Sequence, residues 1–175
     1  MNTILSRLGI SIASFLLVIA LIPSQTVQAA APSRIGLSPN SGTRTRGTTF
    51  TVQVTGWSDK AAYSYSALPA SGSLTFPASR LQVVSTSTSG SSYSNMTVSH
   101  NNSQGTITFN GSKTQPAASN LTFFSVTFRA TATGSAALSF SSDTTVHENW
   151  LYGAPSTTKS GASYTIVAPQ CPAGQ

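Results

Sequence analysis

Residues 50–55 read Phe-Thr-Val-Gln-Val-Thr, and this stretch decides the fold. Its apolar members, Phe50, Val52 and Val54, alternate with polar side chains. Successive side chains of a β-strand point to opposite faces, so a period of two predicts a strand with one face on a core and the other in water. The rest of the chain can be tested for the same period.

The alternation recurs at five further places along the chain. The apolar members there are Met96 and Val98; Ile107 and Phe109; Val126, Phe128 and Ala130; Ala136, Leu138 and Phe140; and Tyr164 and Ile166. Further candidate strands are residues 34–37, 62–67 and 81–85, and turn-forming residues stand at 39–42, 56, 69–72, 90, 101–105, 111, 134 and 153–155. Helical periodicity is missing from every stretch of ten or more residues after the amino-terminal segment. Short strands without interleaved helices predict an all-β fold, an antiparallel sandwich or barrel of about nine strands.

The amino terminus has the composition of an export signal. Arg7 supplies a positive charge, residues 9–22 are almost wholly apolar, and Val27-Gln28-Ala29 offers small residues for cleavage. The apolar run is shorter than the roughly 20 residues that a membrane-spanning helix needs. We therefore expect residues 1–29 to be removed. The remainder is then a secreted or cell-surface protein with no stable membrane insertion.

After that segment, the length fits one domain, which we place at residues 30–167. Residues 168–175 contain two prolines and read as a tail or the start of a linker. The single cysteine, Cys171, excludes an internal disulfide, so packing must stabilise the domain. Cys171 either pairs with a cysteine farther along a longer chain or stays an unpaired or intermolecular thiol.

Charged residues make up only 7% of the chain, and its formal net charge is +6. The basic side chains are scattered along the sequence instead of clustered, which argues against a nucleic-acid partner. Two explanations of the basic excess remain: a weak attraction to an anionic wall or glycan, and a simple solubilising scatter.

Catalytic and metal-binding chemistry has few residues to draw on. The chain holds three carboxylate side chains and two histidines. Asp143 and Glu148 share a predicted loop, where solvated polarity explains them more simply than a glycosidase pair does. His147 lies beside Glu148, but the chain lacks a Gly-x-Ser-x-Gly nucleophile motif. His100 and His147 are far apart in sequence, and a calcium site would have Asp143 as its one candidate carboxylate. We predict a protein that is not an enzyme, with no catalytic residue, metal or cofactor.

Aromatic side chains give the best signal for binding. Trp150 and Tyr152 fall in a predicted loop, where flat rings stack against sugars in many carbohydrate-binding proteins. We take them as candidate carbohydrate-binding residues. Trp57, Tyr63 and Tyr65 are weaker candidates. The alternative for all five is that they cover the edges of the core.

Several of these strands together resemble cohesin domains and the related carbohydrate-binding modules. Residues 46–54, Arg-Gly-Thr-Thr-Phe-Thr-Val-Gln-Val, look like that family's Gly-Asp-Thr-Phe-Thr-Val stretch. Residues 76–84, Phe-Pro-Ala-Ser-Arg-Leu-Gln-Val-Val, are similar to its Tyr-Asp-Pro-x-x-Leu-x-Val-Val, and residues 121–130 to its Leu-x-x-Ile-x-Phe-x-Ala. The resemblance runs from Ser33 to Val167. Three departures are the missing aspartate before Pro77, an apparent insertion at residues 70–75, and a long loop at residues 143–159.

The resemblance implies an antiparallel β-sandwich of the jelly-roll type. It also implies a non-catalytic module that binds a protein partner, a dockerin-like or other surface protein, in extracellular polysaccharide-degrading or surface complexes. It supplies no partner-contacting residue, because the family has no single diagnostic binding motif. Two alternatives remain open: a carbohydrate-binding module that recognises polysaccharide through Trp150 and Tyr152, and a structural subunit of a surface, pilus or matrix.

Overall fold

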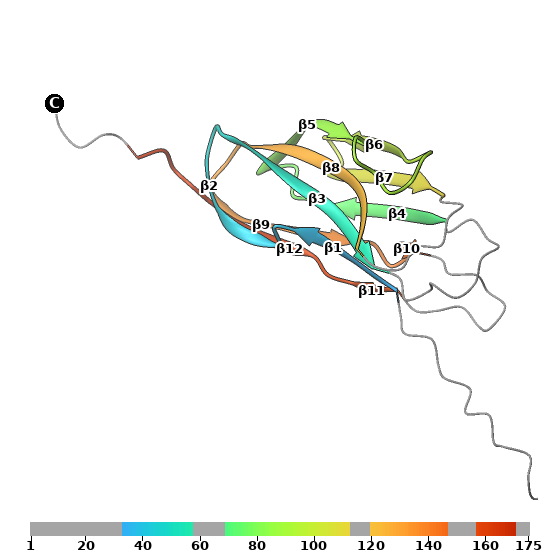
Figure 1. Ribbon diagram of the computed structural model, residues 1–175. Helices are drawn as coiled ribbons and strands as arrows, with labels where there is room; N and C mark the ends of the chain where they lie inside the picture. The colour runs from blue at the N-terminus through green and yellow to red at the C-terminus, as the bar shows by residue number, and fades with distance from the viewer. Residues whose placement is uncertain (1–32, 58–68, 113–119, 147–156, 171–175) are drawn as a thin grey trace, which may run out of the picture.

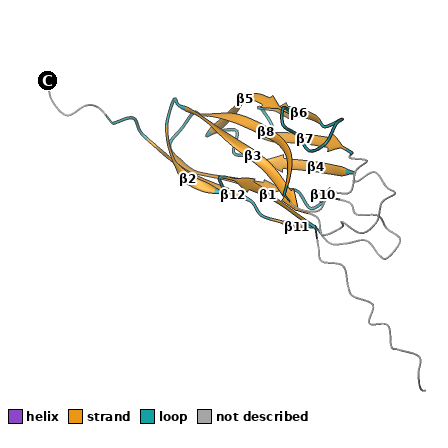
Figure 2. Cartoon of the chain, viewed as in Figure 1, coloured by secondary structure: helices purple, strands orange, loops and turns teal. Residues whose placement is uncertain are grey.

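The computed structural model describes residues 33–57, 69–112, 120–146 and 157–170. All regular structure within these residues is β, and its twelve strands form two sheets that pack as a sandwich (Figures 1 and 2). The predicted all-β sandwich is confirmed, with twelve strands in place of about nine. The predicted strand at 62–67 lies outside the described residues.

The first sheet has five strands in the order β11-β1-β3-β8-β5. They are β1 (Arg34–Ser38), β3 (Thr49–Trp57), β5 (Leu81–Ser87), β8 (Leu121–Ala130) and β11 (Thr158–Lys159). All neighbours are antiparallel except β1 and β11. The register shifts between Val54 and Thr55 and again between Val83 and Ser85, so this sheet is locally irregular.

The second sheet has seven strands, with the order β2-β12-β9-β4-β7-β6 and with β10 paired to β4. They are β2 (Ser41–Thr45), β4 (Ala70–Thr75), β6 (Thr97–Asn101), β7 (Thr106–Gly111), β9 (Gly134–Phe140), β10 (Thr145–Val146) and β12 (Ala162–Val167). β2 and β12 are parallel, and the other pairs are antiparallel. Each pair keeps one continuous register, so this sheet is more regular than the first.

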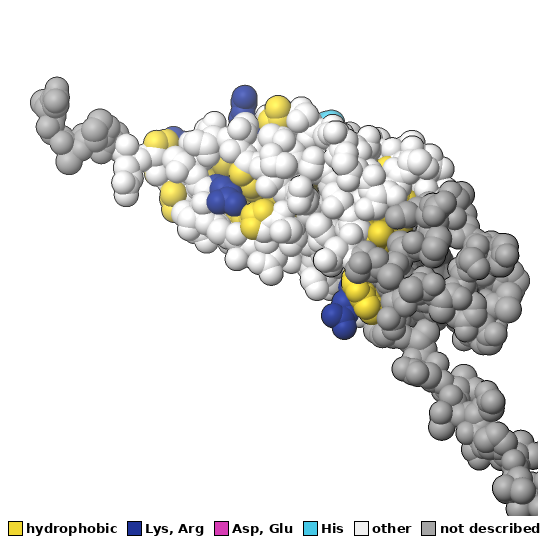
Figure 3. Space-filling view, in the orientation of Figure 1, with side chains coloured by type: hydrophobic (Ala, Val, Ile, Leu, Met, Phe, Trp, Pro, Cys, Tyr) yellow, Lys and Arg dark blue, Asp and Glu magenta, His cyan; other side chains and the backbone are white. Residues whose placement is uncertain are grey.

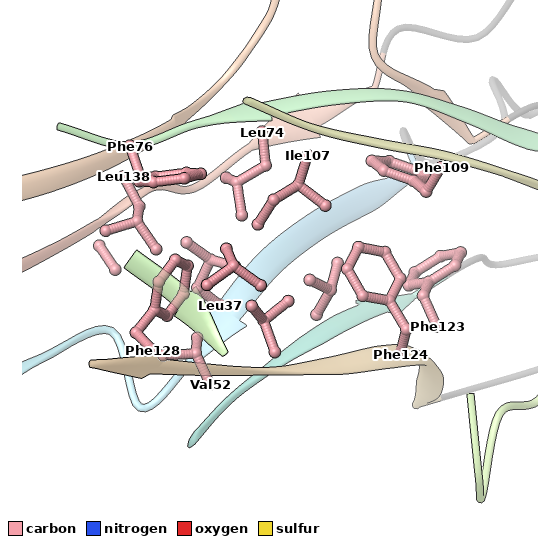
Figure 4. Packing of buried hydrophobic residues seen from close by; sticks show 14 of the residues in the cluster. Leu37, Val52, Leu74, Phe76, Ile107, Phe109, Phe123, Phe124, Phe128 and Leu138 are labelled. Carbon is pink, nitrogen blue, oxygen red and sulfur yellow. The ribbon is translucent and has the colours of Figure 1, made fainter. Parts of the chain in front are cut away.

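The core lies between the two sheets and is built from the predicted alternating positions (Figure 4). Phe128 of β8 is fully buried in it, with its ring centroid 5.8 Å from that of Phe50 and 5.4 Å from that of Phe76. The predicted apolar members are all buried except Val98 and Phe140, which are partly buried against the same cluster. The period-two pattern therefore identified the inward face of each of these strands correctly.

Four strands lie where the sequence predicts other structure. The two-residue strands β10 and β11 lie near the two ends of the predicted loop at residues 143–159. β2 begins inside the predicted turn at residues 39–42, and β4 occupies the predicted turn and insertion at residues 69–75. The inward positions of β2 are Gly42 and Arg44, and one inward position of β4 is Gly72. Because these positions lack apolar side chains, both strands lose the period-two signal.

Local packing explains the glycine in β4. Gly72 has a φ of 152°, and a Cβ at this position would collide with the buried Thr144. A glycine lets the backbone of β4 approach Thr144, and Ser73 uses this approach to donate from its N–H to Thr144 Oγ1 at 3.2 Å.

Candidate interaction face

Of the carboxylates and histidines considered for catalysis or metal binding, the structure describes Asp143 and His100. Within the described ranges, no cluster of three or more His, Cys, Asp or Glu side chains is able to hold a metal ion. Asp143 is exposed and accepts a hydrogen bond from the Ser141 hydroxyl, and His100 is exposed on β6. His147 and Glu148 lie outside the described residues. The part of the chain that the structure describes contains no helix long and apolar enough to cross a membrane.

The outward side of the second sheet carries short, uncharged side chains that align across the strands. The register places them in three rows: Asn101, Thr106, Thr75 and Ser139; Ser99, Thr108 and Ser73; and Thr97, Asn110, Ser71 and Thr145. We call these eleven residues of β6, β7, β4, β9 and β10 the hydroxyl face. It is a regular array of hydroxyl and amide groups, free of charged and large apolar side chains.

Hydrogen bonds between neighbouring strands hold several of these side chains in place. The hydroxyls of Ser99 and Thr108 are 2.6 Å apart, and Thr97 Oγ1 donates to the carbonyl of Asn110 at 2.9 Å. Thr75 Oγ1 donates to the carbonyl of Ser139 at 3.0 Å. Because these rotamers are already fixed, a partner that binds here loses less side-chain entropy than it would against free side chains.

A shallow, open hollow of about 190 Å³ lies over β6 and β7, within the hydroxyl face. The residues that line it are Thr97, Val98, Ser99, Thr108, Phe109 and Asn110. Its size suits a single inserted side chain rather than a small-molecule ligand, since ligand pockets have about 300 to 1,000 Å³.

The outward side of the first sheet is less uniform. Thr51 and Thr127 also pair through their hydroxyls, at 3.0 Å. This side, however, carries the exposed charges of Arg34 and Arg129 and the exposed Val84, and two register shifts interrupt it. Figure 3 shows basic side chains scattered over an otherwise mostly uncharged surface in that view. The hydroxyl face is therefore the more regular of the two.

The predicted carbohydrate-binding residues, Trp150 and Tyr152, lie outside the described residues. The residues that flank their segment are well defined. The fully buried Ser33 donates from Oγ to the carbonyl of Val146 at 3.0 Å and contacts Thr157 Oγ1 at 3.1 Å. Thr157 Oγ1 also accepts from the N–H of Val146 at 3.1 Å. Both ends of the segment are therefore fixed side by side on the sandwich.

Of the three weaker aromatic candidates, the structure describes one, Trp57. Trp57 at the end of β3 is half-buried, and the Arg34 guanidinium lies 5.5 Å from its ring centroid. This contact covers part of the ring. Tyr63 and Tyr65 lie outside the described residues.

Comparison with known proteins shows which solved structures share this fold. No family model matches the sequence, and no curated protein matches it. The structure is similar to the third cohesin of ScaC from Acetivibrio cellulolyticus, solved in complex with the ScaB dockerin: 14% identity, TM-score 0.60, 78% of this chain and 99% of that one covered. It is also similar to a non-cellulosomal cohesin from the archaeon Archaeoglobus fulgidus, with 16% identity, TM-score 0.60 and coverages of 78% and 92%.

A third similar structure comes from a type I cohesin–dockerin complex of Clostridium thermocellum, with 10% identity, TM-score 0.61 and coverages of 83% and 100%. Because this chain covers almost the whole of each cohesin, the likeness extends over a complete domain. The described residues have the fold of a cohesin-type domain, a jelly-roll β-sandwich, as the resemblance in sequence predicted.

The hydroxyl face was not predicted from the sequence. Its residues are the polar members of the alternating stretches, and the sequence analysis assigned them only to the solvent side. The signal that was available is that outward positions of residues 97–110 are all Ser, Thr or Asn, with no Lys, Arg, Asp or Glu among them.

Proposed function

We propose that the chain is a non-catalytic protein-interaction module, exported to the cell surface or the extracellular medium, and that its hydroxyl face binds the partner. The observation that carries the proposal is this uncharged, regularly aligned face on a domain with the cohesin fold. The solved cohesins from Acetivibrio cellulolyticus and Clostridium thermocellum are in complex with dockerins, which supports a dockerin-like partner.

The chemistry of the face suits such a partner. Hydroxyl and amide groups both donate and accept hydrogen bonds, so the rows complement many polar surfaces without burying an unpaired charge. The hollow over β6 and β7 offers a place for one anchoring side chain, beside the polar side chains of Thr97, Ser99 and Thr108.

Thr108→Arg tests the proposal at the middle row of the hydroxyl face. A bulky cation there would have to be desolvated against the partner, and we expect at least about tenfold weaker binding. The measurement is biolayer interferometry against a panel of dockerins that includes those of the Acetivibrio and Clostridium complexes.

Thr51→Arg is the matched control, because it puts the same side chain at an exposed threonine of the first sheet. It should bind as the wild type does. Equal losses in the two variants, or full binding by Thr108→Arg, would reject the hydroxyl face. Failure of every dockerin to bind the wild type would reject the dockerin-like partner.

Polysaccharide binding through Trp150 and Tyr152 is a second candidate function. The observation that favours it is the fixed base of their segment, where Ser33 joins Val146 and Thr157. We expect the wild type to sediment with insoluble glycans and Trp150→Ala to lose this binding. Trp57→Ala serves as the comparison. This candidate function would be rejected if wild type and Trp150→Ala bound the glycan equally well, or if neither protein bound it.

A further inference from the structure

The strands at the ends of the two sheets are β11, β5, β2 and β6, and the two-residue strand β10 pairs with β4 alone. An exposed strand edge presents unpaired N–H and C=O groups to any other extended chain. Natural proteins limit this with short edge strands, basic side chains or local cover. The four edges of this sandwich differ in how far they are covered.

The β5 edge is covered by a side chain that imitates a paired strand. Asn102 accepts from the N–H of Val83 at 2.7 Å and donates to the carbonyl of the same residue at 3.0 Å. Next to it, the N–H of Leu81 donates to the carbonyl of Pro77 at 2.9 Å. An incoming strand would have to displace these bonds.

The β2 edge is covered in a similar way. Arg44 Nη1 donates to the carbonyl of Thr43 at 3.1 Å, and its guanidinium lies over the rings of Phe50 and Tyr164 at 5.0 and 5.5 Å. The carbonyl of Thr45 accepts from both the N–H and the hydroxyl of Thr48, at 3.1 and 2.7 Å. Two carbonyls of this short edge are thus already bonded.

The β11 edge is very short and charged. The strand has two residues, and Lys159 Nζ reaches across to the carbonyl of Ser142 at 2.6 Å. A lysine on a two-residue strand leaves little edge to pair with.

Within the part of the chain that the structure describes, the β6 edge has neither a covering side chain nor a basic residue. It is five residues long, Thr-Val-Ser-His-Asn, and holds no lysine, arginine or proline. Among the described residues, its backbone makes no hydrogen bond outside the ladder with β7. The side chains of Thr97, Ser99 and Asn101 bond to β7 or to the following turn instead. Figure 1 shows β6 at the border of its sheet, beside β5.

We infer that β6 is a strand-addition site and that its occupant is the β6 strand of a second copy of the chain. The strand that best fits an open edge is an extended, uncharged strand with one free edge of its own, and among the described residues β6, which pairs with β7 alone, is such a strand. Two copies related by a two-fold axis through Ser99 pair in antiparallel fashion, with Thr97 opposite Asn101 of the second copy. The paired sheets then carry the two hydroxyl faces on one continuous surface.

The proposed contact between two β6 strands is small, so we expect the dimer to be weak. Five residues extend over about 17 Å, and one strand pair buries less than the roughly 1,000 Å² of a stable interface. The net charge of +6 on each chain opposes association further. We therefore expect a reversible dimer with a dissociation constant on the order of 100 μM.

Sedimentation velocity over a range from about 10 μM to 1 mM tests the inference on the purified exported protein. We expect a concentration-dependent dimer and, by amide hydrogen exchange, slower exchange within Thr97–Asn101 at the high concentration. His100 is exposed on the same side of β6 as Val98, so His100→Lys adds a cation within the edge strand and should weaken the dimer at least about tenfold. Thr43→Lys adds the same charge to the covered β2 edge and should leave it unchanged.

A monomer at every concentration would overturn the inference. So would a dimer that His100→Lys and Thr43→Lys weaken equally, because net charge alone would then explain the loss. Circular dichroism verifies that both variants keep the β-sheet spectrum. The two proposals can fail independently of each other. The test of the hydroxyl face measures dockerin binding by the Thr108→Arg variant, whereas this test measures self-association through β6.

Discussion

Phe128→Ala lowers the free energy of unfolding by about 3 to 5 kcal/mol. Phe128 is fully buried on β8 and touches the rings of Phe50 and Phe76, so its removal leaves a cavity between the two sheets (Figure 4). Neither sheet can move in to fill the space without breaking its own ladder. Urea unfolding followed by circular dichroism gives the difference.

Val84→Ala is the matched control for that substitution. Val84 lies on β5 and is 49% exposed, so shortening it should cost less than about 1 kcal/mol. If Phe128→Ala cost no more than Val84→Ala, the space between the sheets would not be the source of stability that the packing indicates.

The sequence predicted those strands whose inward positions are all apolar. In residues 50–54 of β3 and 126–130 of β8, the inward residues are apolar and alternate with polar ones, and burial of one face alone determines the pattern. β2 and β4 were missed for the opposite reason. Arg44 faces inward, where its long side chain covers two aromatic rings, and Gly72 faces inward where Thr144 approaches the backbone. Such contacts depend on residues far away in the sequence.

The hydroxyl face could not be predicted from the sequence for the same reason: it depends on contacts between residues that are far apart in the chain. Ser99 and Thr108 lie on neighbouring strands joined by a tight turn, and their pairing follows from local alternation. The alignment of Thr108 with Ser73, and of Thr75 with Ser139, requires the order of strands in the sheet. Single-sequence patterns do not contain that order, so the polar residues could be assigned to the solvent side but not to one array.

Tyr93 makes the protein unfold more readily above pH 10. It lies in the connection between β5 and β6, is 2% exposed, and stacks on Phe123 with ring centroids 5.0 Å apart. Within the described part of the chain its hydroxyl has no hydrogen-bond partner. Burial raises the pKa of Tyr93 from 10.0 to about 12, because the phenolate would lose its hydration. The unfolded chain therefore releases this proton at a lower pH than the folded one.

The sign follows from this difference in pKa. Below pH 10, both states keep the proton and stability is unaffected. Between pH 10 and 12, the unfolded chain loses its proton while the folded protein keeps it, so stability falls, by about 1 kcal/mol at pH 11. Tyr93→Phe removes this term. We expect its unfolding free energy to equal or exceed that of the wild type at pH 8, since no hydrogen bond is broken, and to exceed it by at least about 1 kcal/mol at pH 11. Urea titrations at both pH values measure it. If the unfolding free energies of the two proteins changed equally between pH 8 and pH 11, the Tyr93 hydroxyl would be solvated in the folded state. The connection between β5 and β6 would then not exclude water from this residue.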